Sequence, residues 1–212
     1  MTEDLDDLAR VSALTDGVRR AAYRVVAEAT AGPVGRDEVA EVLGVGRTLA
    51  AFHLDKLVDV GLLEVSYARR SGRTGPGAGR PAKLYRISAA EHAVSVPPRA
   101  YRTAAELLAE TVERIGADRA LFEVAREQGR EHPADGRDPA GLLAERGYSP
   151  AGSDRIELRN CPFHQLAEQF PALVCGMNLA LIEGLTEDSG WTARMDPAPG
   201  RCCVSLTKNK GD

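Results

Sequence analysis

The chain has 212 residues, a hydrophobic content of 43% and a formal net charge of −4 at pH 7. This length suits one large or two small domains, and the acidic balance excludes a uniformly basic nucleic-acid-binding protein. The N-terminus is acidic and no apolar run approaches about 18 residues, which argues against a signal peptide and a membrane span. We therefore expect a cytoplasmic protein.

Residues 1–30 predict helices. Apolar residues recur at helical spacing up to Leu14, and Asp16 is placed to cap a second helix over 17–29. Gly32 and Pro33 should end that helix, which would pack behind the elements that follow.

The next stretch predicts a winged helix-turn-helix. A short amphipathic helix over 37–43 is followed by Gly44, which suits the left-handed conformation that ends a helix. A second helix extends over 47–61, and strands over 62–67 and 83–87 enclose a loop rich in Gly and Arg. In DNA-binding proteins of this kind the second helix enters the major groove.

The candidate DNA contacts lie on the second helix and on the wing. The helix side chains that should face the groove are Arg47, Thr48, Ala51, Phe52 and Lys56. Between Tyr67 and Ser88 there are six basic and no acidic residues, which predicts phosphate contacts by the wing. The wing candidates are Arg69, Arg70, Arg73, Arg80 and Lys83.

A domain boundary is predicted over 89–98, where Pro97 and Pro98 stiffen the chain. Amphipathic helices should follow over 99–115, 118–130 and 139–146. The first of them suits packing within the chain and pairing across a homodimer about equally. We place a DNA-binding domain at 1–96, a helical linker and dimerisation region at 97–146, and a cysteine-bearing sensor domain at 147–212. The expected fold class is α+β.

The last region predicts strand, helix, strand and strand. A strand over 154–159 leads to a helix that begins at Pro162, breaks at Pro171 and continues to Gly184. Shorter strands are expected over 191–195 and 202–207, on either side of a turn at 196–200.

All four cysteines lie in this region, at Cys161, Cys175, Cys202 and Cys203. In a reducing cytosol such clustering indicates metal or redox chemistry more than disulfides. Cys161 should lie at a helix N-terminus, where backbone amides favour a thiolate. Strand alternation would send Cys202 and Cys203 to opposite faces, so only one of them should join the other two thiols. His164, one helical turn after Cys161, is a candidate fourth ligand.

Three segments resemble the C-terminal domain of SufR-like regulators, which are ArsR-type winged-helix repressors that bind an iron–sulfur cluster. The segments are 160–164, 171–175 and 200–204, and the N-terminal half is similar over 46–57 and 79–85. The resemblance implies a homodimeric repressor of redox- or iron-responsive genes that binds a double-stranded DNA operator. It implies that Cys161, Cys175 and either Cys202 or Cys203 hold the cluster, with 4Fe–4S favoured over 2Fe–2S.

The same residues also allow other functions. Cys161, His164, Cys175 and one of the last two cysteines would also suit a structural zinc site. A thiol enzyme or a small-molecule-binding protein is a second alternative, although His164 is the only histidine near the cysteines in sequence. A winged helix with a purely structural C-terminal region is a third. We expect no enzymatic activity.

Overall fold

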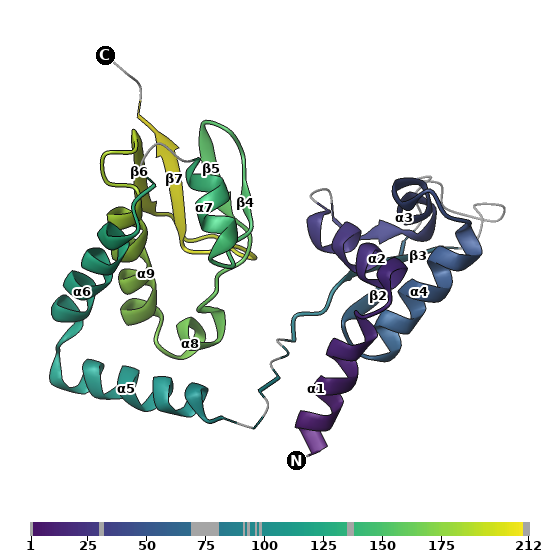
Figure 1. The fold of residues 1–212 in the computed structure, drawn as a ribbon, viewed down its shortest axis with the longest axis horizontal. Helices are drawn as coiled ribbons and strands as arrows, with labels where there is room; N and C mark the ends of the chain where they lie inside the picture. The colour runs from purple at the N-terminus through teal and green to yellow at the C-terminus, as the bar shows by residue number, and fades with distance from the viewer. Residues whose placement is uncertain are drawn as a thin grey trace. The chain divides into compact units, whose positions relative to one another are not determined.

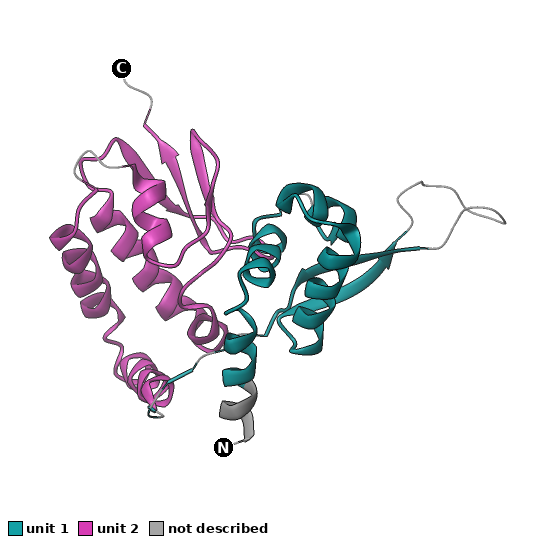
Figure 2. Cartoon of the chain, turned by 45° about the vertical axis from the view of Figure 1, so that its right-hand side comes forward, with its two compact units in different colours: residues 1–99 teal, residues 100–212 magenta. Residues whose placement is uncertain are grey.

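The computed structural model describes residues 2–29, 32–68, 81–90, 92, 94, 95, 97, 99–134 and 138–209. The chain divides into two compact units, Met1–Arg99 and Ala100–Asp212, shown in teal and magenta in Figure 2. Each unit mixes helices with an antiparallel sheet, so the α+β class is confirmed. Among the described helices, none combines the length and the apolar character needed to cross a bilayer.

In its described part, the first unit has four helices and a small sheet (Figure 1). Its elements are α1 (Thr2–Ala13), α2 (Gly17–Glu28), β1 (Val34–Gly35), α3 (Arg36–Leu43), α4 (Arg47–Asp59), β2 (Leu63–Ala68) and β3 (Ala82–Ile87). The sheet is antiparallel in the order β1-β3-β2. This order of helices and strands, closed by the β2–β3 hairpin, is a winged helix-turn-helix.

Local sequence signals account for the helix boundaries of this unit. The Asp16 carboxylate accepts a hydrogen bond from the backbone amide of Arg19 at 2.8 Å and caps α2, as predicted. Gly44 adopts the left-handed conformation with φ 64° and ends α3, also as predicted. The core beneath the helices is apolar, with Leu54, Leu57 and Tyr85 almost fully buried.

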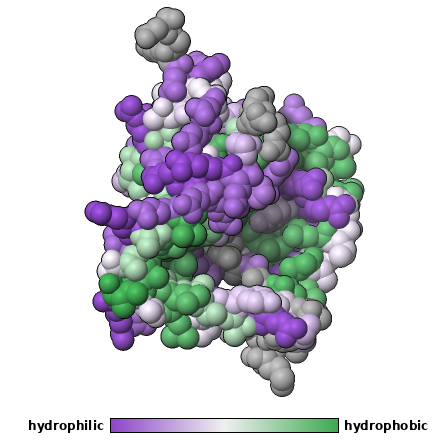
Figure 3. Space-filling view, turned by 60° about the vertical axis from the view of Figure 1, so that its left-hand side comes forward, coloured by the Kyte–Doolittle hydropathy of each residue, from purple (hydrophilic) through white to green (hydrophobic). Residues whose placement is uncertain are grey.

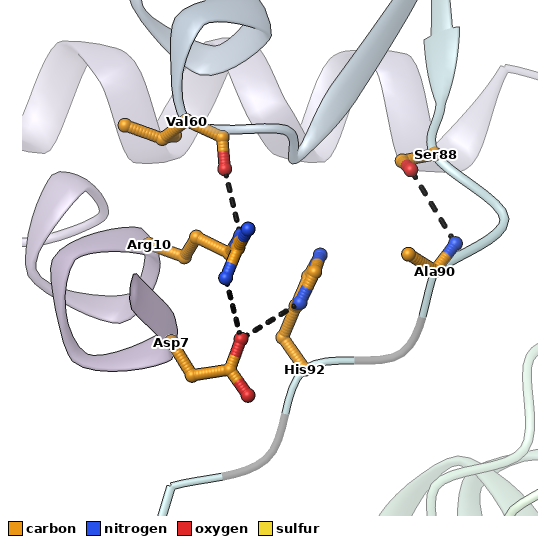
Figure 4. Close-up of polar contacts among 6 residues, drawn as sticks. All are labelled: Asp7, Arg10, Val60, Ser88, Ala90 and His92. Atoms are coloured by element: carbon orange, nitrogen blue, oxygen red, sulfur yellow. Dashed lines mark hydrogen bonds and ion pairs between the residues drawn. The ribbon is translucent and has the colours of Figure 1, made fainter. Parts of the chain in front are cut away.

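A polar cluster joins α1 to the end of α4 and to the segment that leaves the sheet (Figure 4). Arg10 on α1 donates through Nε to the carbonyl of Val60 at 2.9 Å and through Nη1 to the Asp7 carboxylate at 2.8 Å. The same Asp7 oxygen lies 3.0 Å from Nδ1 of His92. His92, in the predicted boundary segment, is therefore held against the first unit.

The second unit contains the remaining helices and a four-stranded sheet (Figure 1). Its elements are α5 (Tyr101–Ile115), α6 (Asp118–Glu131), α7 (Pro139–Glu145), β4 (Pro150–Ala151), β5 (Arg155–Leu158), α8 (His164–Gln169), α9 (Pro171–Leu185), β6 (Trp191–Met195) and β7 (Val204–Lys208). The antiparallel strand order is β4-β5-β7-β6. Leucine, isoleucine and valine side chains from α7, α9 and the strands form one core.

Helices α6 and α9 approach each other closely at glycine. A Cβ atom at Gly129 would clash with the carbonyl oxygen of Leu181 and lie 2.8 Å from the backbone nitrogen of Leu185. A Cβ atom at Gly184 would lie 3.1 Å from the backbone nitrogen of Arg130. Both helix backbones are therefore in contact, and α6 belongs to the same compact unit as the cysteines, although the sequence assigned 97–146 to a separate region.

Several predicted boundaries are wrong. The helix expected from Pro162 begins at His164, and the strand expected from residue 202 begins at Val204. Strands β1 and β4 were not predicted, because a segment of two residues is too short to show alternation.

Candidate nucleic-acid interface and thiol cluster

The helix α4 has one buried and one exposed side. Ala50, His53, Leu54 and Leu57 are buried against the rest of the unit. His53 is therefore on the buried side of the helix and does not face the groove. On the opposite side the predicted groove-facing residues are accessible: Arg47, Thr48, Phe52 and Lys56 are exposed and Ala51 is half-buried.

A groove of about 540 Å³ lies between the N-terminal end of α3, the middle of α4 and the strand β3. Ala51 and Asp55 of α4 line one side, and Lys83 of β3 lines another. Arg36, at the first position of α3, also lines the groove, and the sequence analysis missed it. Its signal was present, since an arginine opens each of the two helices that flank the glycine turn.

Basic side chains around this groove contact carboxylates. Lys83 Nζ lies 2.6 Å from Asp55 Oδ1, which also accepts a hydrogen bond from the Tyr85 hydroxyl at 2.9 Å. Burial raises the pKa of Tyr85, with the hydrogen bond to Asp55 adding to it, so the hydroxyl remains a donor. Phosphates approaching this surface would compete with these carboxylates for the same cations.

Two basic residues of α4 also form ion pairs with carboxylates. Arg47 Nε lies 3.4 Å from Asp37 Oδ1, and Lys56 Nζ lies 3.3 Å from Asp59 Oδ2. These pairs are exposed, so each contributes little to stability and leaves the cation available to a ligand. The predicted wing residues Arg69, Arg70, Arg73 and Arg80 lie outside the described residues.

The four cysteines of the second unit come from three places in the chain. Cys161 lies in the connection between β5 and α8, and Cys175 lies on α9. Cys202 and Cys203 immediately precede β7. All are free thiols; Cys202 is buried and the other three are partly exposed.

The four sulfur atoms form a row of hydrogen-bonded thiols. The thiols of Cys161 and Cys203 both donate to the sulfur of Cys202, and Cys203 is also hydrogen-bonded to Cys175. Hydrogen bonds from Cys161 and Cys203, with further donation by the backbone amide of Val204 and the side chain of Asn178, hold the pKa of Cys202 well below its usual range. The hydrogen bond to Cys202, followed by burial, raises the pKa of Cys161 and also that of Cys203.

The arrangement differs from three details of the sequence-based interpretation. Cys161 does not cap a helix, because α8 begins only at His164 and the residue before it is Phe163. Cys202 and Cys203 precede β7, so strand alternation does not separate them and both thiols join the row. His164 is exposed and its Nε2 lies 3.3 Å from Glu168 Oε1, on the surface of α8.

Two buried polar residues next to the row were missed. Asn178 on α9 is fully buried, and its Nδ2 donates to the sulfur of Cys202 at 3.3 Å. The Tyr148 hydroxyl donates to Asn178 Oδ1 at 2.5 Å, and burial raises the pKa of that hydroxyl. The available signal was an asparagine in a largely apolar helix, three residues after a cysteine.

The chemistry of this donor set fits an iron–sulfur cluster. Thiolates are the usual ligands of such clusters, and the row supplies four sulfurs, one of them already the acceptor of several hydrogen bonds. Among the described residues, no group of three or more His, Cys, Asp or Glu side chains is arranged to hold a single metal ion. The geometry therefore gives no support to a preformed mononuclear zinc site.

No protein-family model and no curated protein matches this chain. A solved structure that it resembles is the homodimeric winged helix-turn-helix DNA-binding domain, a fragment spanning residues 1–100, of a possible ArsR-family transcriptional regulator from Mycobacterium bovis. The identity is 29% and the TM-score 0.29; the match covers 40% of this chain and 66% of that one. The similarity is thus distant and spans less than two thirds of the length of that domain.

Proposed function

We propose that this chain is a homodimeric, cytosolic transcriptional regulator without enzymatic activity. Its first unit binds double-stranded operator DNA through α4 and the wing, and it acts as a repressor. Its second unit reports redox or iron status through an iron–sulfur cluster held by the cysteines. The observation that carries the proposal is the combination, in one chain, of a winged helix and a separate unit with four contacting thiols.

The DNA-binding part is supported by the exposed side of α4. Arg47 and Thr48 lie in its first turn, where recognition helices contact base edges. Arg47 can contact guanine or phosphate, and Lys56 is placed for phosphate. Arg36 and Lys83 add positive charge beside the groove, whose width is bounded by the wing strand. Half-site recognition favours a two-fold symmetric dimer.

The dimer is supported by the surface of α5. Leu107, Leu108 and Ile115 on this helix are 60%, 67% and 70% exposed. Figure 3 shows hydrophobic surface, in green, on the side of the molecule that carries α5 and α6 in Figure 1. An amphipathic helix with so much accessible apolar surface suits pairing with the same helix of a second copy.

The sensing part is supported by the origin of the four sulfurs. A bound cluster would supply an oxidation-sensitive connection among Cys161, Cys175 and the Cys202–Cys203 pair. The hydrogen bonds among the four cysteines link α9 to the connection before α8 and to the segment before β7. When that connection is lost, these three elements are held only by the core and the hydrogen bonds described above.

The DNA-binding part can be tested by selection of duplexes from a random library, followed by fluorescence anisotropy at several salt concentrations. We expect a two-fold symmetric consensus and an affinity that falls steeply with salt. A protein that enriches no sequence and binds duplexes with no salt dependence would exclude DNA recognition by this surface.

The sensing part requires an anaerobic preparation analysed for iron, acid-labile sulfide and zinc, together with its absorption spectrum. We expect iron and sulfide, visible colour, and a change in operator affinity after exposure to oxygen. The Cys161→Ser variant should lose both the colour and the response. Colourless protein that contains only zinc would contradict the cluster and favour a zinc site. An unchanged oxygen response in Cys161→Ser would exclude sensing through this thiol.

A further inference from the structure

We infer that Asn178, oriented by Tyr148, is a positioning residue that fixes the sulfur of Cys202, rather than that of Cys203, at the centre of the thiol row. The inference rests on the proposed function of this site and assigns a role to two residues outside the cysteine set. It also resolves the choice between the two adjacent cysteines, which the sequence left open.

The first argument is the placement of Asn178 on α9. Cys175 and Asn178 are three residues apart, so their side chains share one face of the helix. That face meets the Cys202–Cys203 pair: the Cys175 thiol contacts Cys203, and the Asn178 amide contacts Cys202. One helix face therefore assigns different partners to two consecutive sulfurs.

The second argument is the orientation of the amide. A tyrosine hydroxyl that donates a hydrogen bond requires the carbonyl oxygen of the asparagine as its acceptor. The bond from Tyr148 to Asn178 Oδ1 therefore turns the NH₂ group toward the Cys202 sulfur, 3.3 Å away. Tyr148, Asn178 and Cys202 are 4%, 0% and 2% exposed, so water cannot replace either hydrogen bond without opening the core.

The third argument is that Tyr148 is itself anchored to the segment that carries Cys161. Asn160 Nδ2 donates to the carbonyl of Gly147 at 2.6 Å, and the backbone amide of Arg159 donates to the carbonyl of Ser149 at 2.8 Å. The residues before Cys161 are thus hydrogen-bonded to the neighbours of Tyr148, and Tyr148 is linked through Asn178 to the sulfur of Cys202. This connection between the first and third thiol segments does not require a bond between their sulfurs.

The consequence for a bound group is specific. Outer hydrogen bonds orient metal ligands, and their removal typically costs about 10–100-fold in metal affinity. A hydrogen bond to a ligating sulfur also stabilises the more negative, reduced state of an iron–sulfur cluster. Loss of the Asn178 amide should therefore weaken metal binding and make a reconstituted cluster harder to reduce.

The test uses the full-length, reduced chain with Cd²⁺ as a soft, thiolate-selective probe. Affinity is measured by chelator competition and followed by the cadmium–thiolate absorption. We expect Asn178→Leu, which keeps the side-chain volume, to lose about tenfold or more in affinity. Tyr148→Phe should lose less, because the amide remains but is no longer oriented. Cys202→Ser should lose more than Cys203→Ser.

The matched control is Thr186→Val on the same helix. Thr186 is also buried and polar, and its hydroxyl donates to the Ile182 carbonyl at 2.8 Å, away from the thiols. It should leave Cd²⁺ affinity unchanged. Thermal unfolding of every variant shows whether it is folded, and Tyr148→Phe and the two serine variants keep the test decisive if Asn178→Leu does not fold.

A spectroscopic readout separates positioning from simple packing. In ¹⁵N-labelled protein loaded with ¹¹³Cd²⁺, the Asn178 side-chain amide, assigned by its absence in Asn178→Leu, should show a cadmium-dependent shift and coupling through the sulfur. Cd²⁺ binding by the wild type with no effect of Asn178→Leu, and with equal losses in both serine variants, would overturn the inference and leave the proposed function intact. A wild-type chain that binds neither Cd²⁺ nor iron and sulfide would overturn both.

Discussion

At the scale of single residues, the segment that carries Cys202 and Cys203 depends on one carboxylate. Asp196 accepts hydrogen bonds from Arg201 at 2.7 Å and from Arg155 at 2.5 Å, and its backbone amide donates to the Cys203 carbonyl at 2.7 Å. The hydrogen bond from Arg201 is the main cause that lowers the pKa of Asp196 below its ordinary value of 3.8. The ionised carboxylate is thus the form that holds this segment.

This ionisation predicts a loss of stability in acid. A carboxyl group whose pKa is depressed by folding stabilises the folded state above its unfolded pKa, and that contribution disappears as the pH falls through the folded value. Wild-type stability should therefore decline below about pH 4, and Asp196→Asn should flatten the curve in that window. Urea unfolding at a series of pH values measures this.

The control for this prediction is Glu145→Gln, at the exposed end of α7. Its stability curve should keep the wild-type steepness below about pH 4. Parallel curves for the wild type and Asp196→Asn would show that this carboxylate does not contribute to the acid sensitivity.

At the scale of elements, the contact between α6 and α9 depends on Gly129. Gly129→Ala introduces a Cβ atom into the backbone of α9 and should destabilise the chain by about 1–3 kcal/mol. Gly141→Ala in α7 is the matched control. Its Cβ atom would meet no atom within 4 Å, so alanine should be neutral or stabilising by about 0.5–1 kcal/mol. Chemical denaturation distinguishes the two, and equal stabilities would refute the close approach of the helices.

Helix α4 offers a second test at this scale. If Arg47 contacts a guanine, Arg47→Ala should weaken operator binding by about 1–3 kcal/mol and relax specificity at one position. If it contacts phosphate, binding should weaken for all sequences and the salt slope should fall by about 1. Arg194→Ala on β6 of the other unit should do neither. Unchanged binding by Arg47→Ala would remove this residue from the interface.

The elements show what the sequence could and could not predict. Helix α2 and the α3–α4 turn were predicted because their determinants are local: the Asp16 cap and the left-handed Gly44. The thiol row required long-range information. Cys202 and Cys203 were assigned to opposite strand faces, but the chain pairs as a regular strand only from Val204. Asn178 had only a local signal in the sequence, and its role could not be predicted because its partners Tyr148 and Cys202 are 30 and 24 residues away.

At the scale of the whole molecule, dimerisation through α5 is testable. Leu108→Glu places a charge on a side chain that is 67% exposed in the single chain. If that surface pairs with a second copy, the substitution should shift the protein from dimer to monomer and reduce operator affinity, while the fold of each unit is retained. Sedimentation measures the mass. Arg119→Glu, an exposed change at the start of α6, controls for the added negative charge; a dimer that survives Leu108→Glu would require another interface.

The glycine contact between α6 and α9 has a consequence for how a signal could leave the thiols. Since the two backbones touch, with no side chain between them to yield, Cys175 and the whole of α6 must shift together. The start of α6 follows α5 after Gly116, and α5 in turn follows the segment that leaves the first unit. A displacement of Cys175 that moves α9 would therefore also move α6, the helix that follows α5 in the chain.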